Sequence, residues 1–302
     1  MKKFFILILP VVLLFGCKPS QTKQELKKDV VTVSILPQQY FVNKIAGELL
    51  EVNVMIPPGA SPVTYEPTPK QMQELSKSFA YFRIGHIEFE KSWMKNFENM
   101  NPDMQIINLS AEAELIEPEP EDGHESHEGH NHDGHHHHGI DPHIWTSPKE
   151  VRKQAKLIYE FLLRELPGQK DILENNYNQF VLEIDSLDNY LNMVLTPYKG
   201  KKFLIFHPAL SYIARDYGLE QISIEIDGKE PTPANIQEII SIAKKEQIKI
   251  VFVQMQFSTH NAEVIADEIK GAVVQIDPLD PDWAAGIKNI ADEIVKSYST
   301  GL

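Results

Sequence analysis

Several features that would place this chain in a common functional class are scarce or absent. It contains one cysteine, Cys17, so no intramolecular disulfide can form. Acidic residues outnumber basic ones by 43 to 29, and the formal charge of −14 argues against nucleic acid or an anionic membrane surface as the main partner. The metalloprotease motif H-E-x-x-H does not occur. Beyond the N-terminus there is no second long apolar run, so we expect the body of the chain to lie in water.

The N-terminus has the pattern of a secretory signal. Two lysines precede an apolar run, residues 4–15, which is too short to span a membrane. The sequence LFGC at 14–17 resembles the lipobox of bacterial lipoproteins, which implies an acylated Cys17 as the mature N-terminus. Plain secretion with a chance cysteine is the alternative. We expect a signal peptide at 1–17, a polar tether at 18–29, and a lipid anchor that holds the protein on a membrane facing the periplasm or the exterior.

Histidine is concentrated in one internal segment. Eight of the fifteen residues from 124 to 138 are histidine, interleaved with acidic and small residues. Neutral imidazole is a good ligand for zinc, copper, nickel and iron, although such a segment can also be a solvated polar loop. We predict a disordered insertion at about 113–139 that serves as an auxiliary metal-binding loop. Its candidate ligands are His124, His127, His130, His132, His135, His136, His137 and His138.

Short apolar runs and helical stripes alternate along the rest of the chain. Runs rich in apolar and β-branched residues predict strands at 30–36, 51–56, 80–84, 105–109, 202–206, 221–225, 248–253 and 272–276. Helical patterns lie between them, the first of them at 38–50. This alternation predicts an α/β fold of two lobes, each with a mainly parallel four-stranded sheet flanked by helices.

A helical connector is predicted between the lobes. Ser147 and Pro148 are suited to begin a helix, and Pro167-Gly168 interrupts it. A second helix then runs to about Thr196, and its apolar residues form one continuous stripe. We expect this long helix to join the lobes rigidly. The predicted domains are an N-terminal lobe at 30–146, a connector at 147–197 and a C-terminal lobe at 198–302.

Four residues follow predicted strands or loops that would face the crevice between the lobes. His86, His207 and Asp277 each come after a strand, and His143 comes after the His-rich insertion. Ligands bind at the carboxyl ends of parallel strands, and two or three histidines with one carboxylate suit a metal such as zinc. Each residue alone has a simpler interpretation, since strand-end histidines often only form hydrogen bonds and an Asp before Pro often caps a turn. Their shared position favours a metal site.

Short motifs in a fixed order resemble the metal-specific solute-binding proteins of bacterial ABC transporters. They are PPGASP at 57–62, YEPTP at 65–69, DPHIW at 141–145, FHPA at 206–209, EPTP at 230–233 and DPL at 277–279. The resemblance covers roughly residues 30–300. It implies two lobes joined by a long helix, a metal between them, and delivery by a monomer to a membrane permease and its ATPase. The His-rich loop and His207 are similar to the zinc branch of the family; Mn²⁺ and other divalent metals remain open.

Two positions depart from that family pattern. Val63 stands where zinc-type members usually have histidine, and Gln254 stands where we would expect glutamate. Valine cannot bind a metal, so His86 is the tentative replacement, with a loop histidine or water as alternatives. The predicted zinc ligands are therefore His143, His207 and Asp277, with His86 tentative.

Other functions remain open at this stage. A periplasmic metal buffer or chaperone, or an adhesin without a permease, would have the same sequence features. A secreted zinc hydrolase is the remaining alternative, with Glu66, Glu225 or Glu230 near the crevice. We predict a binding protein and no enzyme.

Overall fold

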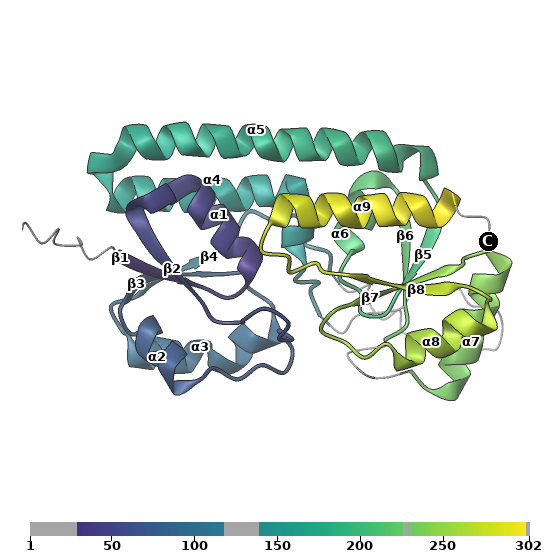
Figure 1. Ribbon diagram of the computed structural model, residues 1–302. Coiled ribbons are helices and arrows are strands. Elements are labelled where there is room, and N and C mark those ends of the chain that lie inside the picture. Colours follow the sequence, from purple (N-terminus) through teal and green to yellow (C-terminus); the bar gives the residue numbers. More distant parts are fainter. Residues whose placement is uncertain (1–28, 118–138, 226–228, 230, 300–302) are drawn as a thin grey trace, which may run out of the picture.

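Two parallel sheets lie side by side beneath a shared layer of helices (Figure 1). The computed structural model describes residues 29–117, 139–225, 229 and 231–299. The sheets have the strand orders β2-β1-β3-β4 and β6-β5-β7-β8, so the second half of the chain repeats the topology of the first. The predicted two-lobe α/β fold is confirmed. Cys17, residues 18–28 of the predicted tether and the histidines of the auxiliary loop lie outside the described residues, whereas Asp29 already begins the first strand.

The N-terminal lobe is built on the first sheet. Its strands are β1 (Asp29–Val33), β2 (Leu50–Val54), β3 (Ser78–Arg83) and β4 (Gln105–Asn108), and its helices are α1 (Leu36–Ala46), α2 (Pro69–Leu75) and α3 (Glu88–Met100). Residues 30–33 are buried on both faces of the sheet, as a central parallel strand requires. Helix α1 is shorter than the predicted 38–50. It begins early because Pro37 suits a first turn, and it ends where Gly47 adopts a positive φ of 57°.

The C-terminal lobe follows the same plan. Its strands are β5 (Lys202–Ile205), β6 (Glu220–Ser223), β7 (Ile250–Gln254) and β8 (Ala272–Ile276), and its helices are α6 (Ser211–Tyr217), α7 (Pro233–Lys245), α8 (His260–Glu268) and α9 (Trp283–Ser299). Every strand pair in both sheets is parallel. The carboxyl ends of the four strands in a sheet therefore lie at one edge, where polar residues from distant parts of the sequence can meet.

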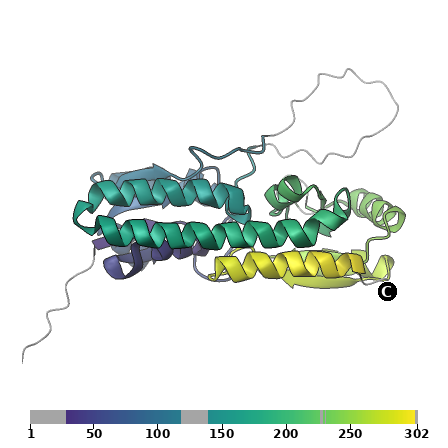
Figure 2. The ribbon, with the colours of Figure 1, turned by 90° about the horizontal axis from the view of Figure 1, so that it is seen from above.

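Two helices connect the lobes. Helix α4 (Pro148–Glu165) is capped by the Ser147 hydroxyl, which accepts a hydrogen bond from the Glu150 amide. Helix α5 (Lys170–Leu195) has 26 residues and is thus about 39 Å long, enough to cover both lobes. Seen from above, α4, α5 and α9 lie side by side (Figure 2). The predicted long helix is confirmed, and its buried stripe is Leu173, Phe180, Ile184, Leu187, Leu191 and Leu195.

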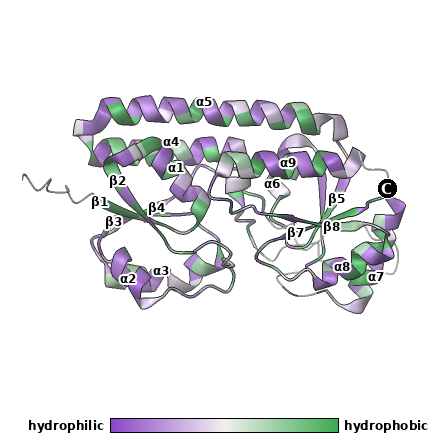
Figure 3. Cartoon of the chain, viewed as in Figure 1, coloured by the Kyte–Doolittle hydropathy of each residue, from purple (hydrophilic) through white to green (hydrophobic). Residues whose placement is uncertain are grey.

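The hydrophobic core extends through both lobes. One cluster of buried side chains includes Phe41 of α1, Phe180 of α5, Phe203 of β5 and Trp283 of α9. A second cluster lies between the second sheet and helices α7 and α8. The outer helices alternate hydrophobic and hydrophilic residues, whereas the central strands are mainly hydrophobic (Figure 3). The indole of Trp283 packs edge-on against Phe41, with ring centroids 5.3 Å apart. The start of α9 is therefore buried against the N-terminal lobe.

The segment before the His-rich loop is packed against the core. Leu115 and Ile116 are partly buried there, and the Ile116 amide donates a hydrogen bond to the Tyr212 hydroxyl. Residues 113–117 of the predicted insertion are thus in contact with both lobes, whereas 118–138 lie outside the described residues. Within the described part of the chain, no helix combines the length and apolar character needed to cross a membrane.

Candidate metal centre

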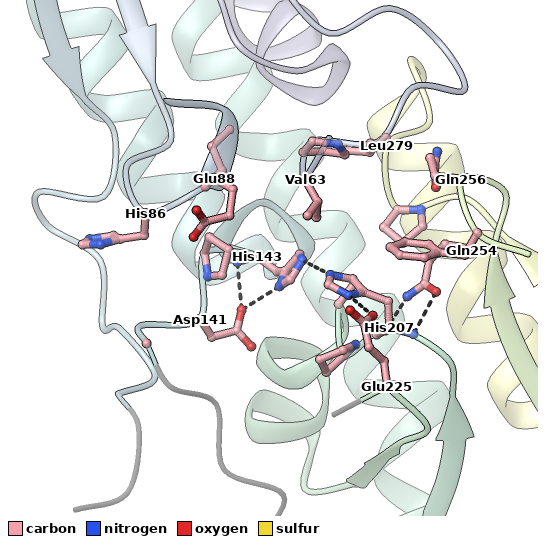
Figure 4. Close-up of a pocket in the computed structure, with 18 of the residues that line it drawn as sticks. Val63, His86, Glu88, Asp141, His143, His207, Glu225, Gln254, Gln256 and Leu279 are labelled. Carbon is pink, nitrogen blue, oxygen red and sulfur yellow. Dashed lines mark hydrogen bonds and ion pairs between the residues drawn. The ribbon is translucent and has the colours of Figure 1, made fainter. Parts of the chain in front are cut away.

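Two histidines from different parts of the chain meet in the crevice between the lobes. His207 follows β5 at the carboxyl edge of the second sheet, and His143 directly precedes the short 3-10 segment Ile144–Thr146. Their Nε2 atoms are 3.2 Å apart, and their ring centroids are 5.1 Å apart (Figure 4). Both side chains are largely buried, with 11% of His143 and 18% of His207 exposed.

A carboxylate holds the other nitrogen of each ring. Nδ1 of His143 is 2.8 Å from Oδ1 of Asp141, which also accepts a hydrogen bond from the His143 amide. Nδ1 of His207 is 2.7 Å from Oε2 of Glu225, which follows the neighbouring strand β6. The carboxylates fix the orientation of each ring and the position of its proton, as is usual for histidines that bind metals. The structure thus identifies Asp141 and Glu225 as the partners that orient the pair.

When both imidazoles are neutral, their Nε2 atoms cannot form a hydrogen bond with each other. Because each Nδ1 donates its proton to a carboxylate, each Nε2 carries only a lone pair. Two lone pairs at 3.2 Å repel unless a proton or a metal ion lies between them. Two imidazole nitrogens bound to one tetrahedral zinc ion would be about 3.3 Å apart, given a zinc–nitrogen distance of about 2.05 Å. The His143–His207 pair therefore has the spacing of two zinc ligands.

The surroundings of His207 keep its ring neutral. Burial lowers the pKa of His207, and the nearby His143 adds to this, while the Glu225 carboxylate opposes both. Its backbone is fixed by Gln254 at the end of β7, whose side chain accepts from the His207 amide and donates to the His207 carbonyl. One face of the imidazole stacks on Phe257, with ring centroids 4.9 Å apart. A buried, neutral and immobilised imidazole suits metal binding.

Asp141 stays ionised although it is buried. Burial alone would raise the pKa of its carboxyl, but the electrostatic interaction with His143 and the hydrogen bonds from that residue together hold the pKa below its usual range. Its backbone carbonyl accepts a hydrogen bond from the Tyr212 hydroxyl at 2.7 Å. The negative charge beside His143 makes that imidazole a more basic metal ligand.

A cavity of about 500 Å³ opens in front of the pair. It is lined from the N-terminal lobe by Val63, His86 and Lys91, and from the C-terminal lobe by Gln256, Phe257 and Leu279, among others. Val63 faces the histidine pair across this space and is 46% exposed (Figure 4). Gln254, which stands where the family pattern suggests glutamate, also lines the cavity. The oxygen and the nitrogen of its side chain both form hydrogen bonds with the backbone of His207.

The other two predicted ligands are not gathered with the pair. His86 lines the same cavity, but its ring points away from His143 and His207 (Figure 4). Asp277 lies at the carboxyl end of β8, where its Oδ1 accepts hydrogen bonds from the Leu279 amide and the Gln256 side chain. Among the described residues, no group of three or more His, Cys, Asp or Glu side chains is placed to hold a metal ion. The four-residue ligand set stays a prediction.

The backbone just before His86 is held in place by a glycine and by hydrogen bonds to a buried carboxylate. Gly85 has a φ of 88°, and a Cβ there would meet the Ser110 hydroxyl at 2.6 Å, so glycine is required. The buried carboxylate of Glu90 accepts hydrogen bonds from the Ile84 and Gly85 amides at 2.8 and 2.7 Å. The Ser34 hydroxyl also donates to Glu90. Burial raises the pKa of Glu90 to about 7, although these hydrogen bonds oppose the rise.

Comparison with known proteins shows that this chain is similar to components of zinc-uptake systems. Residues 31–297 match the model of the ZnuA family, described as the periplasmic component A of the zinc-uptake complex. The high-affinity zinc uptake system protein ZnuA of Bacillus subtilis is 27% identical over 90% of this chain and 86% of its own length. The zinc-binding lipoprotein AdcA of Streptococcus pneumoniae is also 27% identical, but the chain spans only 55% of that protein.

Solved structures agree with the family match. A crystal structure of ZnuA superposes with a TM-score of 0.81 and 37% identity, covering 89% of this chain and 99% of the other. A deletion mutant of ZnuA with zinc bound gives a TM-score of 0.80 at the same identity. The periplasmic zinc-binding protein TroA of Treponema pallidum, at 19% identity and a TM-score of 0.74, shares the fold.

Proposed function

The chain belongs to the ZnuA family of periplasmic zinc-uptake components, and from that premise we propose that it captures zinc outside the cytoplasm for an ABC importer. It would hold one Zn²⁺ in the crevice between its lobes and deliver it to a membrane permease that works with an ATPase. The family is one of solute-binding transport proteins, and we propose no catalytic role for this member.

One observation carries the proposal. The Nε2 atoms of His143 and His207 are 3.2 Å apart with their lone pairs facing each other, and carboxylates hold the opposite nitrogens. A zinc ion between them would replace this repulsion with two bonds. Because Asp141 and Glu225 flank the rings, the charge of the ion would be partly balanced by nearby carboxylates.

Asp277 is proposed as the third ligand. It follows β8 and accepts its hydrogen bonds from Gln256 and Leu279 through Oδ1. His86 is proposed as the fourth ligand, and it would need a movement of its loop. We propose that the histidines at 124–138 gather zinc near the crevice, and that an acylated Cys17 anchors the protein to a membrane.

The first experiment is a competition titration with a chromophoric chelator, using zinc and manganese in turn. We expect His207→Ala to weaken zinc binding by at least about 100-fold, since it removes one of the two paired imidazoles and leaves the Glu225 carboxylate without its partner. His260→Ala is the matched control, because His260 is exposed at the start of α8, outside the cavity. Unchanged zinc affinity in His207→Ala would contradict the proposal.

A second titration separates the crevice from the loop. A chain that lacks residues 124–138 should still bind one zinc ion tightly and manganese weakly, since the histidine pair lies outside that segment. If tight zinc binding disappears with the loop, the capture site is in the loop and the function shifts toward a metal buffer.

A further inference from the structure

The two histidines of the pair belong to separate segments of the chain. His143 lies just before α4, whereas His207 lies between β5 and α6, 64 residues further on. Their Nε2 atoms are nevertheless 3.2 Å apart. Asp141 and Glu225 each orient one ring and do not join the two segments to each other through their side chains. The distance between the rings therefore depends on contacts between the segments that carry them.

A buried tyrosine on α6 makes such a contact. The Tyr212 hydroxyl donates a hydrogen bond to the Asp141 carbonyl at 2.7 Å and accepts one from the Ile116 amide at 3.2 Å. The side chain is 0% exposed, and burial raises the pKa of Tyr212, so its hydroxyl remains a donor at neutral pH. Removal of this hydroxyl would leave the buried Asp141 carbonyl without its donor.

The residues that Tyr212 contacts are also bonded to each other. The Asp141 amide donates to the Ile116 carbonyl at 2.9 Å, so the described chain on either side of residues 118–138 comes together at this point. Arg215, also on α6, places its guanidinium over the Tyr212 ring, 4.8 Å from the centroid, which favours one position of the ring. Helix α6 therefore holds the chain that leads into the site.

The position of the Asp141 carbonyl is transmitted directly to His143. Only Pro142 lies between the two residues, and its ring fixes φ at about −65°, which leaves little freedom between that carbonyl and the His143 backbone. The Asp141 carboxylate belongs to the same residue and accepts hydrogen bonds from the amide and the ring of His143, at 2.9 and 2.8 Å. Tyr212 thus acts on the direction of the imidazole as well as on its position.

The other end of this connection is fixed relative to His207. Gln221 of β6 holds the turn between His207 and α6, since its side chain accepts from the Leu210 amide at 2.8 Å and donates to the Ser211 hydroxyl at 2.9 Å. Tyr212 follows Ser211 directly. The imidazole of His207 and the hydroxyl of Tyr212 are therefore carried by one braced segment of the C-terminal lobe.

We propose that Tyr212 is a positioning residue of the zinc site, which holds His143, through the backbone of Asp141, at the distance from His207 at which both rings bind one ion. Tyr212 does not line the cavity, so it would act without touching the metal. The proposal rests on the zinc site proposed above, and it adds the residue that sets the spacing of the histidine pair.

The test is competition titration of the whole chain with zinc, using Tyr212→Phe, which removes the hydroxyl and keeps the ring. We expect zinc affinity to fall about tenfold, as for other residues that orient a metal ligand. Tyr217→Phe is the matched control. The Tyr217 hydroxyl lies on the same helix and donates to the Asp188 side chain at 2.7 Å, outside the cavity lining. Its removal should leave zinc affinity unchanged.

NMR of the metal-free protein separates positioning from a general effect on stability. The shifts of the ring nitrogens of His143, assigned by their loss in His143→Ala, report which nitrogen carries the proton. The parent chain and Tyr217→Phe should show the proton on Nδ1, whereas Tyr212→Phe should show a mixture of the two tautomers. A loss of zinc affinity without a change in this ring would mean that the hydroxyl acts elsewhere, and the proposal would be wrong.

The titration also distinguishes this proposal from the zinc site itself. If the parent chain binds zinc tightly and Tyr212→Phe binds it equally well, the hydroxyl supports the fold alone, and only the role of Tyr212 is refuted. If the parent chain binds no zinc, the proposed function fails, and the role of Tyr212 fails with it.

Discussion

At the residue scale, the proposed site would depend on two carboxylates, Asp141 and Glu225, that the zinc ion itself would not contact. Asp141 and Glu225 each fix the tautomer and direction of one imidazole, so both Nε2 atoms face the same point. Without them, a buried histidine can rotate or place its proton on the wrong nitrogen. The contribution of these residues to metal affinity should therefore be separable from that of the ligands.

We predict that Glu225→Gln weakens zinc binding by about 10–100-fold while the fold is retained. The amide oxygen can still accept a hydrogen bond from Nδ1 of His207, but the loss of charge makes the ring a poorer donor to the metal. Competition titration measures the effect. Glu220→Gln is the control, since Glu220 is exposed at the other end of β6. A Glu225→Gln affinity within twofold of the parent chain would show that Glu225 has no part in the site.

Part of this arrangement could be predicted from the sequence. The sequence predicted that His143 and His207 face the crevice, because one follows the His-rich insertion and the other follows a clear strand. The role of Glu225 was missed, because its contact with His207 exists only when β5 and β6 are neighbours in the sheet. Asp141 lies two residues before His143, and its contact with that amide is a common local pattern that could have signalled the pairing.

A second buried carboxyl should make stability depend on pH. The pKa of Glu90 is raised from 4.5 to about 7 by burial, so between these values the folded chain binds more protons than the unfolded chain. The contribution of Glu90 to stability is therefore fully present below pH 4.5 and is lost as pH rises through 7. The change across this window is up to about 3 kcal/mol.

The measurement is chemical unfolding of metal-free protein between pH 5 and about 8, for the parent chain and Glu90→Gln. Glutamine leaves one loop amide without an acceptor, so the variant is expected to be less stable at low pH. The decisive quantity is the difference in unfolding free energy between the parent chain and Glu90→Gln. This difference should shrink as pH rises, because only the parent chain loses stability through the ionisation of Glu90. Glu88→Gln, at an exposed position on the same helix α3, is the matched control. A constant difference for Glu90→Gln would refute the raised pKa.

At the scale of elements, two tryptophans join the loops that carry the predicted ligands. The Trp145 indole donates a hydrogen bond to the Pro278 carbonyl at 2.9 Å, and the Trp283 indole donates to the Trp145 carbonyl at 2.7 Å. Trp145 lies two residues after His143, and Pro278 follows Asp277 directly. The indole hydrogen bonds thus tie together the loops of two predicted ligands, one in each half of the chain.

We predict that Trp145→Phe weakens zinc binding several-fold. The ring remains, but the buried Pro278 carbonyl loses its donor, which costs about 1–3 kcal/mol and releases the loop of Asp277. Zinc titration and thermal unfolding should be measured together, with Trp93→Phe of α3 as control. A lower unfolding temperature with unchanged zinc affinity would show that this hydrogen bond supports the fold alone.

The sequence predicted the elements themselves better than the directions of their side chains. Apolar β-branched runs identified the eight strands, and the apolar stripe identified α5, because these patterns reflect burial that repeats along one element. The placement of Asp277 after β8 was also correct. The orientation of the Asp277 side chain was not predictable, because it is set by hydrogen bonds that the Leu279 amide and the Gln256 side chain both donate to the same oxygen.

At the scale of the whole molecule, the lobes share a core. The cluster that contains Phe41 of the N-terminal lobe continues through Phe180 of α5 to Phe203 and Trp283 of the C-terminal lobe. The alternation of strands and helices predicted two lobes but not this continuity, because packing between lobes leaves no periodic signal in either one. A shared core predicts that the two lobes unfold together.

Trp283→Ala tests this expectation most directly. Trp283 is 1% exposed and packs against Tyr40, Phe41 and Phe180, so the cavity left by the substitution should cost about 3–5 kcal/mol. Hydrogen exchange of amides in β1 and β7 reports the two lobes separately, and protection should fall by the same factor in both. Trp93→Ala, a half-buried residue of α3 away from this junction, should cost less. If only the second sheet loses protection, the lobes are independent units, and α5 joins them without coupling their stability.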